Sequence, residues 1–356
     1  MVETYIGEVP IEETDEQRYL GFILSSKGDN MANINHMKKK SKGIIRRIFS
    51  KLEKLNLRKY YVECAIIFLK VMLRSSILYA CECYYNLKEN EIRQLEMIEE
   101  GFLKELLKTG KSCPLSQLYA EFGLIPARYE IIRIRLLYLQ NILTQKEDSM
   151  IYCMFKLQLQ QPKRGDWAST CFENLKELGI EVSLEEIKIM KKSKFKYLLN
   201  EKIALSAFEY LKQKQGSKGQ EINFSELEPA DYLSPNSGLL LEDQRKVFSI
   251  RNRMVKIVNN FSNIKQNCLC GEIDSLQHIY LCKLFCETND EEVTDFEEIY
   301  SNNISKLVKV LERFETQFSK REKVLEENRR NIGNENTPCD LLKDPLFSSL
   351  IESSNG

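Results

Sequence analysis

The spacing of apolar residues divides the chain into a short β-like start and a long helical remainder. From residue 31 to about residue 143, apolar residues recur at every third or fourth position, for example at Ile45, Ile48, Leu52 and Leu55. This spacing puts them on one helix face and predicts that the face is buried. Further helices are predicted at residues 57–85, 89–107, 127–143, 184–214, 240–261 and 304–330. The predicted fold class is therefore mainly α.

The first 28 residues have a different pattern. Residues 5–9 and 17–24 are rich in β-branched and aromatic side chains, and Pro10 and an acidic stretch separate them. The two segments predict two strands of a short β-hairpin or of a sheet edge, followed by a turn at residues 25–30. Two strands alone are marginally stable in water. We therefore expect the hairpin to be the remnant of a larger sheet, or to be completed by another element.

Shifts in composition predict five segments along the chain. In order, they are a β-hairpin at 1–28, a helical bundle at 29–145, a helical connector at 146–247, a Cys/His knuckle at 248–290, and a charged helix with a tail at 291–356. Within the connector, the polar residues 158–164 predict a linker. The tail from residue 331 onward is rich in Gly, Asn, Ser and Pro, which predicts disorder.

Net charge and cysteine content narrow the class of protein. The 52 basic and 52 acidic residues balance, so the charge of the whole chain implies no partner. The eleven cysteines are odd in number and follow no recognisable secretory signal, which favours reduced thiols and an intracellular location. The most apolar stretch, residues 62–87, contains Lys70, Arg74 and Glu82 and is too interrupted to span a bilayer. It predicts a buried helix and no membrane partner.

One cluster of residues has the spacing of a metal site. Cys268, Cys270, His278 and Cys282 follow the pattern C-x-C-x7-H-x3-C. Three thiolates and one imidazole are ligands that Zn²⁺ prefers in a tetrahedron, and four protein ligands make a closed, structural site. His278 and Cys282 lie one helical turn apart and face the same way. Cys286 could replace Cys282 as the fourth ligand, and the alternative to a Zn²⁺ site is a cysteine-rich turn without metal.

A second cluster is basic and lies near the start of the predicted bundle. Its members are Lys38, Lys39, Lys40, Lys42, Arg46, Arg47, Lys51, Lys54, Arg58 and Lys59. On a helix, Arg47, Lys51, Lys54 and Arg58 would form a stripe away from the apolar face, a pattern that suits the phosphate backbone of RNA or DNA. The alternative is an ordinary solvated helix face. A weaker run of lysines at 188–196 is expected to be solvated surface.

Several motifs, taken in order, resemble one known family. Residues 18–22 (Arg-Tyr-Leu-Gly-Phe), followed by a turn and the basic helix, look like the Tyr-Leu-Gly strand between palm and thumb of LINE-type (non-LTR) retrotransposon reverse transcriptases. Residues 77–84 resemble the family's Leu-Tyr-Gly segment, with Ala80 in place of the usual glycine and Tyr84 near its tryptophan. Residues 95–104 resemble the helix that follows, and residues 245–253 resemble the approach to the family's C-terminal zinc-binding domain. The resemblance covers about residues 15–286.

The resemblance implies a thumb-like bundle at 29–145, a residual palm edge at 1–28, and nucleic-acid binding by the thumb helix and the knuckle. The family polymerises with aspartates that hold two metal ions, and this sequence contains no Asp-Asp pair. We therefore expect a nucleic-acid-binding, C-terminal fragment of a reverse transcriptase with no catalysis of its own. A domesticated RNA- or DNA-binding protein is one alternative. Another is an all-helical interaction protein with a structural zinc, docking through residues 304–330. The oligomeric state stays open.

Overall fold

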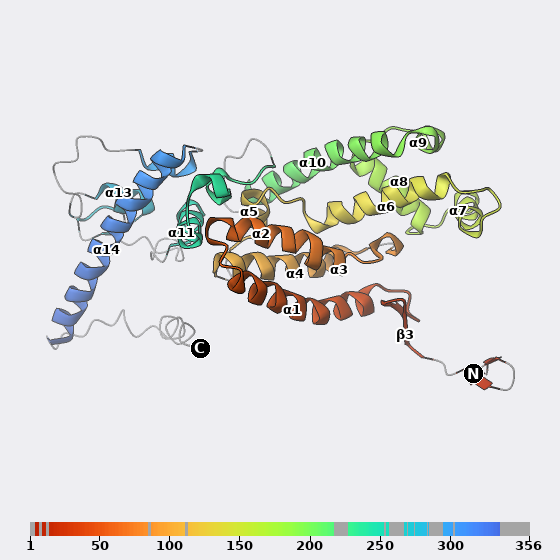
Figure 1. Cartoon of the computed structure of the whole chain (residues 1–356), viewed down its shortest axis with the longest axis horizontal. Helices are drawn as coiled ribbons and strands as arrows, with labels where there is room; N and C mark the ends of the chain where they lie inside the picture. Colours follow the sequence, from red (N-terminus) through yellow and green to blue (C-terminus); the bar gives the residue numbers. More distant parts are fainter. Residues whose placement is uncertain are drawn as a thin grey trace. The chain divides into compact units, whose positions relative to one another are not determined.

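The chain falls into two units, Met1–Met254 and Val255–Gly356, which are described separately. The structure is a computed structural model (Figure 1). It describes residues 4–6, 9–11, 14–84, 87–110, 113–216, 227–252, 254–255, 267–268, 270–273, 275–282, 284, 295–301 and 303–334. The prediction of a mainly helical chain with a β-hairpin at its start is confirmed. None of the described helices is both long enough and apolar enough to cross a membrane.

Two antiparallel hairpins open the first unit. Strand β1 (Thr4–Ile6) pairs with β2 (Val9–Ile11), and β3 (Glu16–Tyr19) pairs with β4 (Phe22–Ser25). The prediction of a single strand across residues 17–24 is wrong. Leu20 and Gly21 have φ of 45° and 90°, and positive φ at both central residues is typical of a type I′ turn between paired strands.

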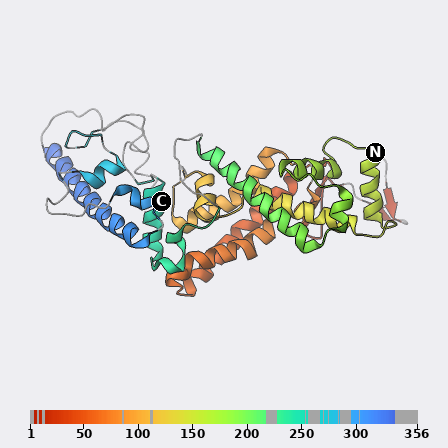
Figure 2. The ribbon, with the colours of Figure 1, turned by 90° about the horizontal axis from the view of Figure 1, so that it is seen from above.

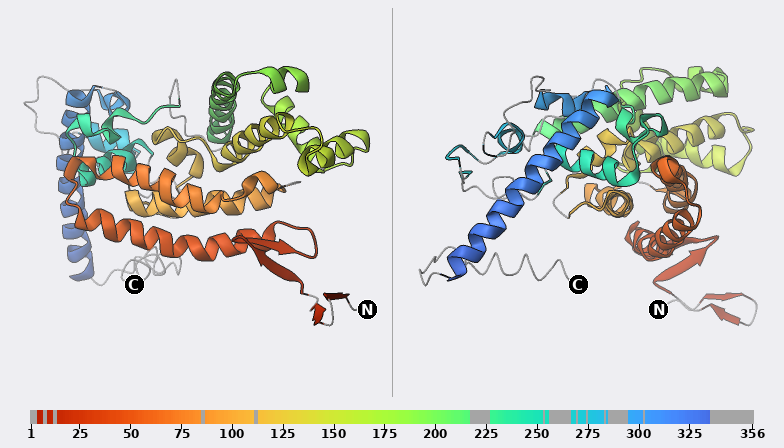
Figure 3. Two further views of the ribbon diagram at one scale, coloured as in Figure 1. Left: turned by 45° about the vertical axis from the view of Figure 1, so that its right-hand side comes forward. Right: turned by 60° about the vertical axis from the view of Figure 1, so that its left-hand side comes forward.

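Helix α1 (Met31–Lys54) follows the second hairpin, as Figure 3 shows. Its buried side chains are Asn33, Ile34, Met37, Ser41, Ile44, Ile48 and Leu52. Ile48 and Leu52 therefore lie on the buried face, as predicted, and Ile45 is half-buried. Leu55 is exposed, contrary to prediction, because the helix ends at Lys54.

The apolar stretch after α1 forms one helical run of changing pitch. It comprises η1 (Arg58–Tyr60), α2 (Tyr61–Phe68), the π-helical η2 (Leu69–Arg74) and α3 (Ser75–Ile77). Its inner face is buried, as predicted, at Val62, Ala65, Leu69, Leu73 and Ile77. The helix predicted to reach residue 85 ends at Ile77. Beyond it, Ala80 adopts a left-handed conformation (φ 58°), and a short 3-10 turn, η3 (Cys81–Cys83), follows.

The remaining helices of the first unit complete two packed layers (Figures 1 and 2). They are α4 (Glu89–Leu107), α5 (Leu115–Glu121), α6 (Ala127–Leu143), α7 (Met150–Gln160), α8 (Trp167–Glu177), α9 (Leu184–Ile189), α10 (Lys192–Gly216), η4 (Asp231–Leu233), η5 (Pro235–Ser237) and α11 (Leu241–Arg251). Helices α4 and α6 match their predicted bounds. Helix α7 reaches Gln160, so the first residues of the linker predicted at 158–164 are helical. Helix α11 ends at Arg251, and most of the predicted extension to residue 261 lies outside the described residues.

The single helix predicted at 184–214 is interrupted. Met190 is extended (ψ 135°) between α9 and α10. The side-chain amide of Gln140, on α6, donates hydrogen bonds to the carbonyl oxygens of Ile187 (3.0 Å) and Met190 (2.9 Å). These bonds satisfy carbonyls that a continuous helix would have bonded internally, so a residue distant in sequence stabilises the break.

The two layers of the first unit are joined by a buried ionic network. Arg74 donates to the carboxylate of Glu99 on α4 (Nε–Oε1 2.7 Å) and to the carbonyl oxygen of Ile125 (2.6 Å). The Tyr119 hydroxyl of α5 donates to the same carboxylate at 2.7 Å. Arg74 Nη2 also donates to the second oxygen of Glu99 (2.9 Å), and Nη1 lies 3.6 Å from the carboxylate of Glu130 on α6. The charged atoms of the pair are therefore matched, which a buried ion pair requires.

The second unit is built on one long helix. Its elements are α13 (Leu276–Leu281), η6 (Phe296–Tyr300) and α14 (Ile304–Asn334). The rings of Tyr280 and Phe296 lie 5.4 Å apart, and those of Phe296 and Phe314 lie 6.4 Å apart. Aromatic side chains thus join all three elements in one core. Helix α14 extends past the predicted residue 330, and residues 335–356 of the expected tail lie outside the described residues.

Candidate metal centre and basic surface

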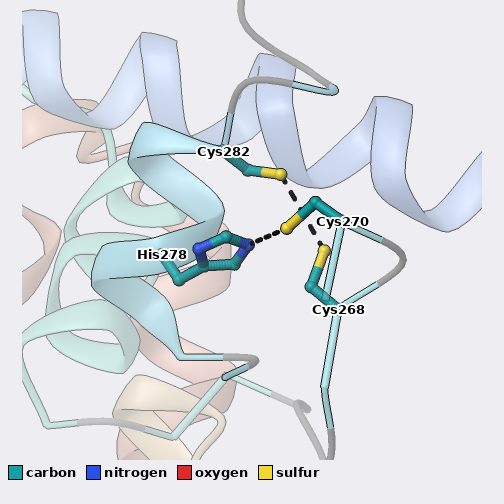
Figure 4. A group of neighbouring side chains, drawn as sticks. All are labelled: Cys268, Cys270, His278 and Cys282. Carbon is teal, nitrogen blue, oxygen red and sulfur yellow. Dashed lines mark hydrogen bonds between the residues drawn. The ribbon is translucent and has the colours of Figure 1, made fainter. Parts of the chain in front are cut away.

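The four residues of the Cys/His pattern come together in the second unit. The Sγ atoms of Cys268 and Cys282 are 3.8 Å apart, and Cys270 Sγ lies 3.2 Å from Nε2 of His278 (Figure 4). All four ligand atoms lie within 4.8 Å of one another. The four side chains could therefore hold one metal ion.

Local backbone geometry explains how the first two cysteines are presented. Cys268 N–H donates to the carbonyl oxygen of Glu272 (2.7 Å), and Gly271 N–H donates to that of Cys268 (2.9 Å). Gly271 has φ of 93°, a conformation that glycine adopts without steric cost. The resulting tight turn directs both thiols to the same side.

The other two residues of the cluster lie on α13 and directly after it. The Ser275 hydroxyl caps this helix by accepting from His278 N–H at 3.0 Å. Cys282 directly follows the last helical residue, so His278 and Cys282 lie one turn apart, as predicted. In Figure 4 both side chains point toward the turn that carries the other two thiols.

The electrostatics of the thiols differ between the exposed and the buried side of the cluster. A hydrogen bond from the Glu272 backbone lowers the pKa of the exposed Cys270 thiol. Burial raises the pKa of Cys282 to about 12. Ligand thiols lose their protons when a metal ion binds, so metal binding here would release a proton from Cys282.

A residue far along the chain covers the cluster. Cys268 and Cys282 are buried, and Val324 of α14 packs against them. Sequence spacing could not identify Val324, because it lies on a different element, more than 40 residues beyond the last ligand. The alternative ligand Cys286 lies outside the described residues.

The structure divides the ten basic residues between two elements. Lys38 to Lys54 lie on α1, whereas Arg58 and Lys59 lie on η1. The predicted stripe on a single helix is therefore wrong at Arg58. Asn56 has φ of 44°, and the chain changes direction between the two elements.

Most of this basic surface faces solvent. Among the ten, all are exposed except Lys38, which donates to Oε1 of Gln94 at 2.5 Å. With the other described residues, none of the ten forms an ion pair within 4.0 Å. Burial raises the pKa of the Glu105 carboxyl, and the nearby Arg46 guanidinium opposes that rise. The surface therefore carries an excess of positive charge.

An aromatic residue adjoins this surface that charge counting did not identify. The Lys59 ammonium lies 5.3 Å from the centre of the exposed Tyr60 ring. An exposed tyrosine within a lysine- and arginine-rich segment is the sequence signal that could have found it. Such a ring can stack on a nucleic-acid base.

The weaker lysine run lies on α9, on α10 and in the break between them. Lys188 is half-buried, 4.0 Å from Glu147 and 6.0 Å from the centre of the Tyr152 ring. The other lysines of this run are exposed: Lys191, Lys192, Lys194 and Lys196. This surface offers a matched comparison for the basic residues of α1.

Two of the motifs that resemble the reverse-transcriptase family touch each other. The Tyr79 hydroxyl donates to the carbonyl oxygen of Leu20 at 2.9 Å. A Cβ on Gly21 would lie 3.6 Å from the Tyr79 ring. The β3–β4 turn is thus held by a residue of the second motif.

No protein-family model, no curated protein and no solved structure matches this chain. The family resemblance therefore rests on the sequence motifs alone.

Proposed function

We propose that this chain binds RNA or DNA through the basic surface of α1 and η1, and that Zn²⁺ in the Cys/His cluster orders the second unit. We further propose that it corresponds to the thumb and zinc-binding region of a LINE-type reverse transcriptase. The observation that carries the binding proposal is the solvent-facing row of lysines and arginines on α1, which lacks ion-pair partners among the described residues.

The length of this row suits several phosphates. From Lys39 to Lys54, an α-helix rises about 22 Å at 1.5 Å per residue. Over that distance duplex DNA carries about a dozen phosphates. Glu53 is the one acidic residue in this stretch. Phosphate contacts of this kind give affinity without base specificity, so the proposal is general binding to a polyanion.

Local geometry supports the family assignment. The resemblance puts a glycine where this chain has Ala80, and Ala80 adopts a left-handed φ of 58° that favours glycine. The neighbouring residue, Tyr79, contacts the Leu20–Gly21 turn of the first motif. The backbone conformation at Ala80 therefore explains a glycine at that position in the family, and the contact with Tyr79 links the two motifs.

The distances in the cluster support Zn²⁺. Zn–S bonds of about 2.3 Å and Zn–N bonds of about 2.0 Å, at tetrahedral angles, put two sulfurs about 3.8 Å apart and a sulfur about 3.5 Å from a nitrogen. The Cys268–Cys282 separation is 3.8 Å, and the Cys270–His278 separation is 3.2 Å. Four protein ligands leave no position for substrate, so the role we propose for the ion is structural.

Salt-dependent binding of the full chain tests the main proposal. Labelled single-stranded RNA and duplex DNA would be titrated with wild type and with Arg47→Glu/Lys51→Glu/Lys54→Glu at several salt concentrations. We expect the variant to bind at least tenfold more weakly. We also expect the slope of log K against log[salt] to become less steep by about 2 to 3 in magnitude. Each of the three lost phosphate contacts removes about 0.7 to 0.9 from it.

The control variant changes the net charge equally at the weaker lysine run: Lys191→Glu/Lys192→Glu/Lys194→Glu. We expect it to retain most of the wild-type slope, because those residues lie on other elements. Equal losses in both variants would mean that only net charge matters. Wild-type binding that is undetectable, or unchanged by the α1 reversal, would refute the proposed surface.

Metal content tests the zinc proposal. We expect one Zn²⁺ per purified chain, measured by mass spectrometry of the metal and by native mass, and its loss in His278→Ala. The matched control is His36→Ala, which removes the other histidine of the chain, on α1. Absence of Zn²⁺ from the wild type, or its retention in His278→Ala, would contradict the assignment.

A further inference from the structure

Helix α7 carries apolar side chains on two sides, yet it is covered on only one. Its sequence contains a single charged residue, Lys156, and its only buried residue is Phe155. An apolar stripe along a helix ordinarily faces another packed surface. The uncovered side of α7 therefore needs a partner.

The uncovered side is a continuous stripe opposite Phe155. At 100° per residue, positions 150, 153, 154 and 157 fall within about a third of the helix circumference. They are Met150, Cys153, Met154 and Leu157. The exposed fractions are 80% for Met150, 56% for Met154 and 59% for Leu157, and Cys153 is exposed as well. Spacing of three and four residues is the pattern by which one helix packs along another.

The charges at the two ends of α7 indicate what the partner is. Glu147 and Asp148 precede the helix, whereas Lys163 and Arg164 follow it, and all four are exposed. Of the other charges nearby, Lys188 lies 4.0 Å from Glu147. The other charged residues close to α7 in sequence are Lys146, Lys156 and Asp166. Asp166 caps α8. The helix thus has an acidic start, an apolar middle and a basic end.

We propose that α7 pairs antiparallel with α7 of a second copy of this chain. A two-fold axis between residues 155 and 156 sets the acidic pair 147–148 of one copy opposite the basic pair 163–164 of the other. The same axis sets Met154 against Leu157 of the second copy. Self-complementarity of this kind is the requirement of a two-fold interface.

The surface involved is that of a weak dimer. The stripe offers about 400–500 Å² of apolar area per copy, with Met154 and Leu157 at the axis and Met150 and Cys153 toward its flank. Pairing would remove at most about 800–1,000 Å² from water, the size of a transient interface. We expect half-association between about 10 and 500 µM chain. A second copy turned by the two-fold axis presents the matching charge order by symmetry, whereas any other partner would have to supply it independently.

Sedimentation velocity of the full chain across this concentration range tests the pairing. The mass of the wild type should rise from 41.7 kDa toward twice that value. Met154→Glu/Leu157→Glu should stay at the monomer mass with an unchanged helical circular dichroism spectrum, because both residues are exposed. The control Ile189→Glu/Tyr197→Glu alters two exposed apolar residues of α9 and α10 and should associate as the wild type does.

Charge exchange tests the antiparallel order. Glu147→Lys/Asp148→Lys and Lys163→Glu/Arg164→Glu should each weaken association at least threefold, and all four changes together should restore it. A monomeric wild type up to 500 µM would overturn the proposal, as would association that survives Met154→Glu/Leu157→Glu. Single-end reversals without effect would overturn the antiparallel geometry.

Discussion

Replacing Ala80 with glycine should stabilise the first unit, although glycine substitutions usually destabilise. Ala80 has φ of 58°, in the left-handed region. That conformation costs an L-residue about 1–2 kcal/mol. Glycine relieves this cost. It also makes the unfolded chain more flexible, which lowers the free energy of unfolding by about 0.4–1 kcal/mol. The net expectation for Ala80→Gly is a gain of about 0.5–1 kcal/mol in the free energy of unfolding.

The assay uses the only tryptophan of the chain. Trp167 lies in the first unit, and its indole N–H donates to the carbonyl oxygen of Glu82 at 2.6 Å, two residues beyond Ala80. Its fluorescence during urea denaturation therefore reports this region. The control is Ala204→Gly in the middle of α10, where loss of helix propensity should cost about 1 kcal/mol. If both variants were destabilised alike, the strain assigned to Ala80 would be refuted.

Three further outcomes follow from other contacts. Tyr79→Phe removes the hydrogen bond to Leu20 and should lower the free energy of unfolding by about 0.5–1 kcal/mol. Amide exchange in β3 and β4 should become faster, and unchanged exchange would show that this bond does not hold the turn. Arg74→Met leaves the buried Glu99 carboxylate without its cation and should lower the free energy of unfolding, measured in urea, by about 3–5 kcal/mol. A decrease of less than about 1 kcal/mol would contradict the network. Chelation of the metal, or His278→Ala, should expose α13 and α14 to limited proteolysis while the fluorescence transition of the first unit stays in place; equal loss in both units would refute their separate cores.

Contacts made within a short stretch of sequence were predictable for this chain. The faces of α1 and the bounds of α4 and α6 follow from apolar spacing, because a helix repeats every 3.6 residues whatever surrounds it. The Cys/His cluster was predictable for a similar reason. Cys268 and Cys270 share one turn, while His278 and Cys282 lie one helical turn apart, so local geometry alone aligns each pair.

Long-range packing decided the rest. The break before α10 depends on Gln140 of α6, and the turn at Leu20 is held by Tyr79, 59 residues away. Val324 covers the Cys/His cluster from another helix. Apolar spacing shows that a face will be buried, but the partner depends on which surfaces meet once the whole chain has folded. Sequence therefore determined the helical class, the buried faces and the four residues of the Cys/His cluster. Tertiary structure alone decided where the helices at 57–85 and 184–214 break, which basic residues of α1 and η1 lack ion-pair partners among the described residues, and that one side of α7 is left uncovered.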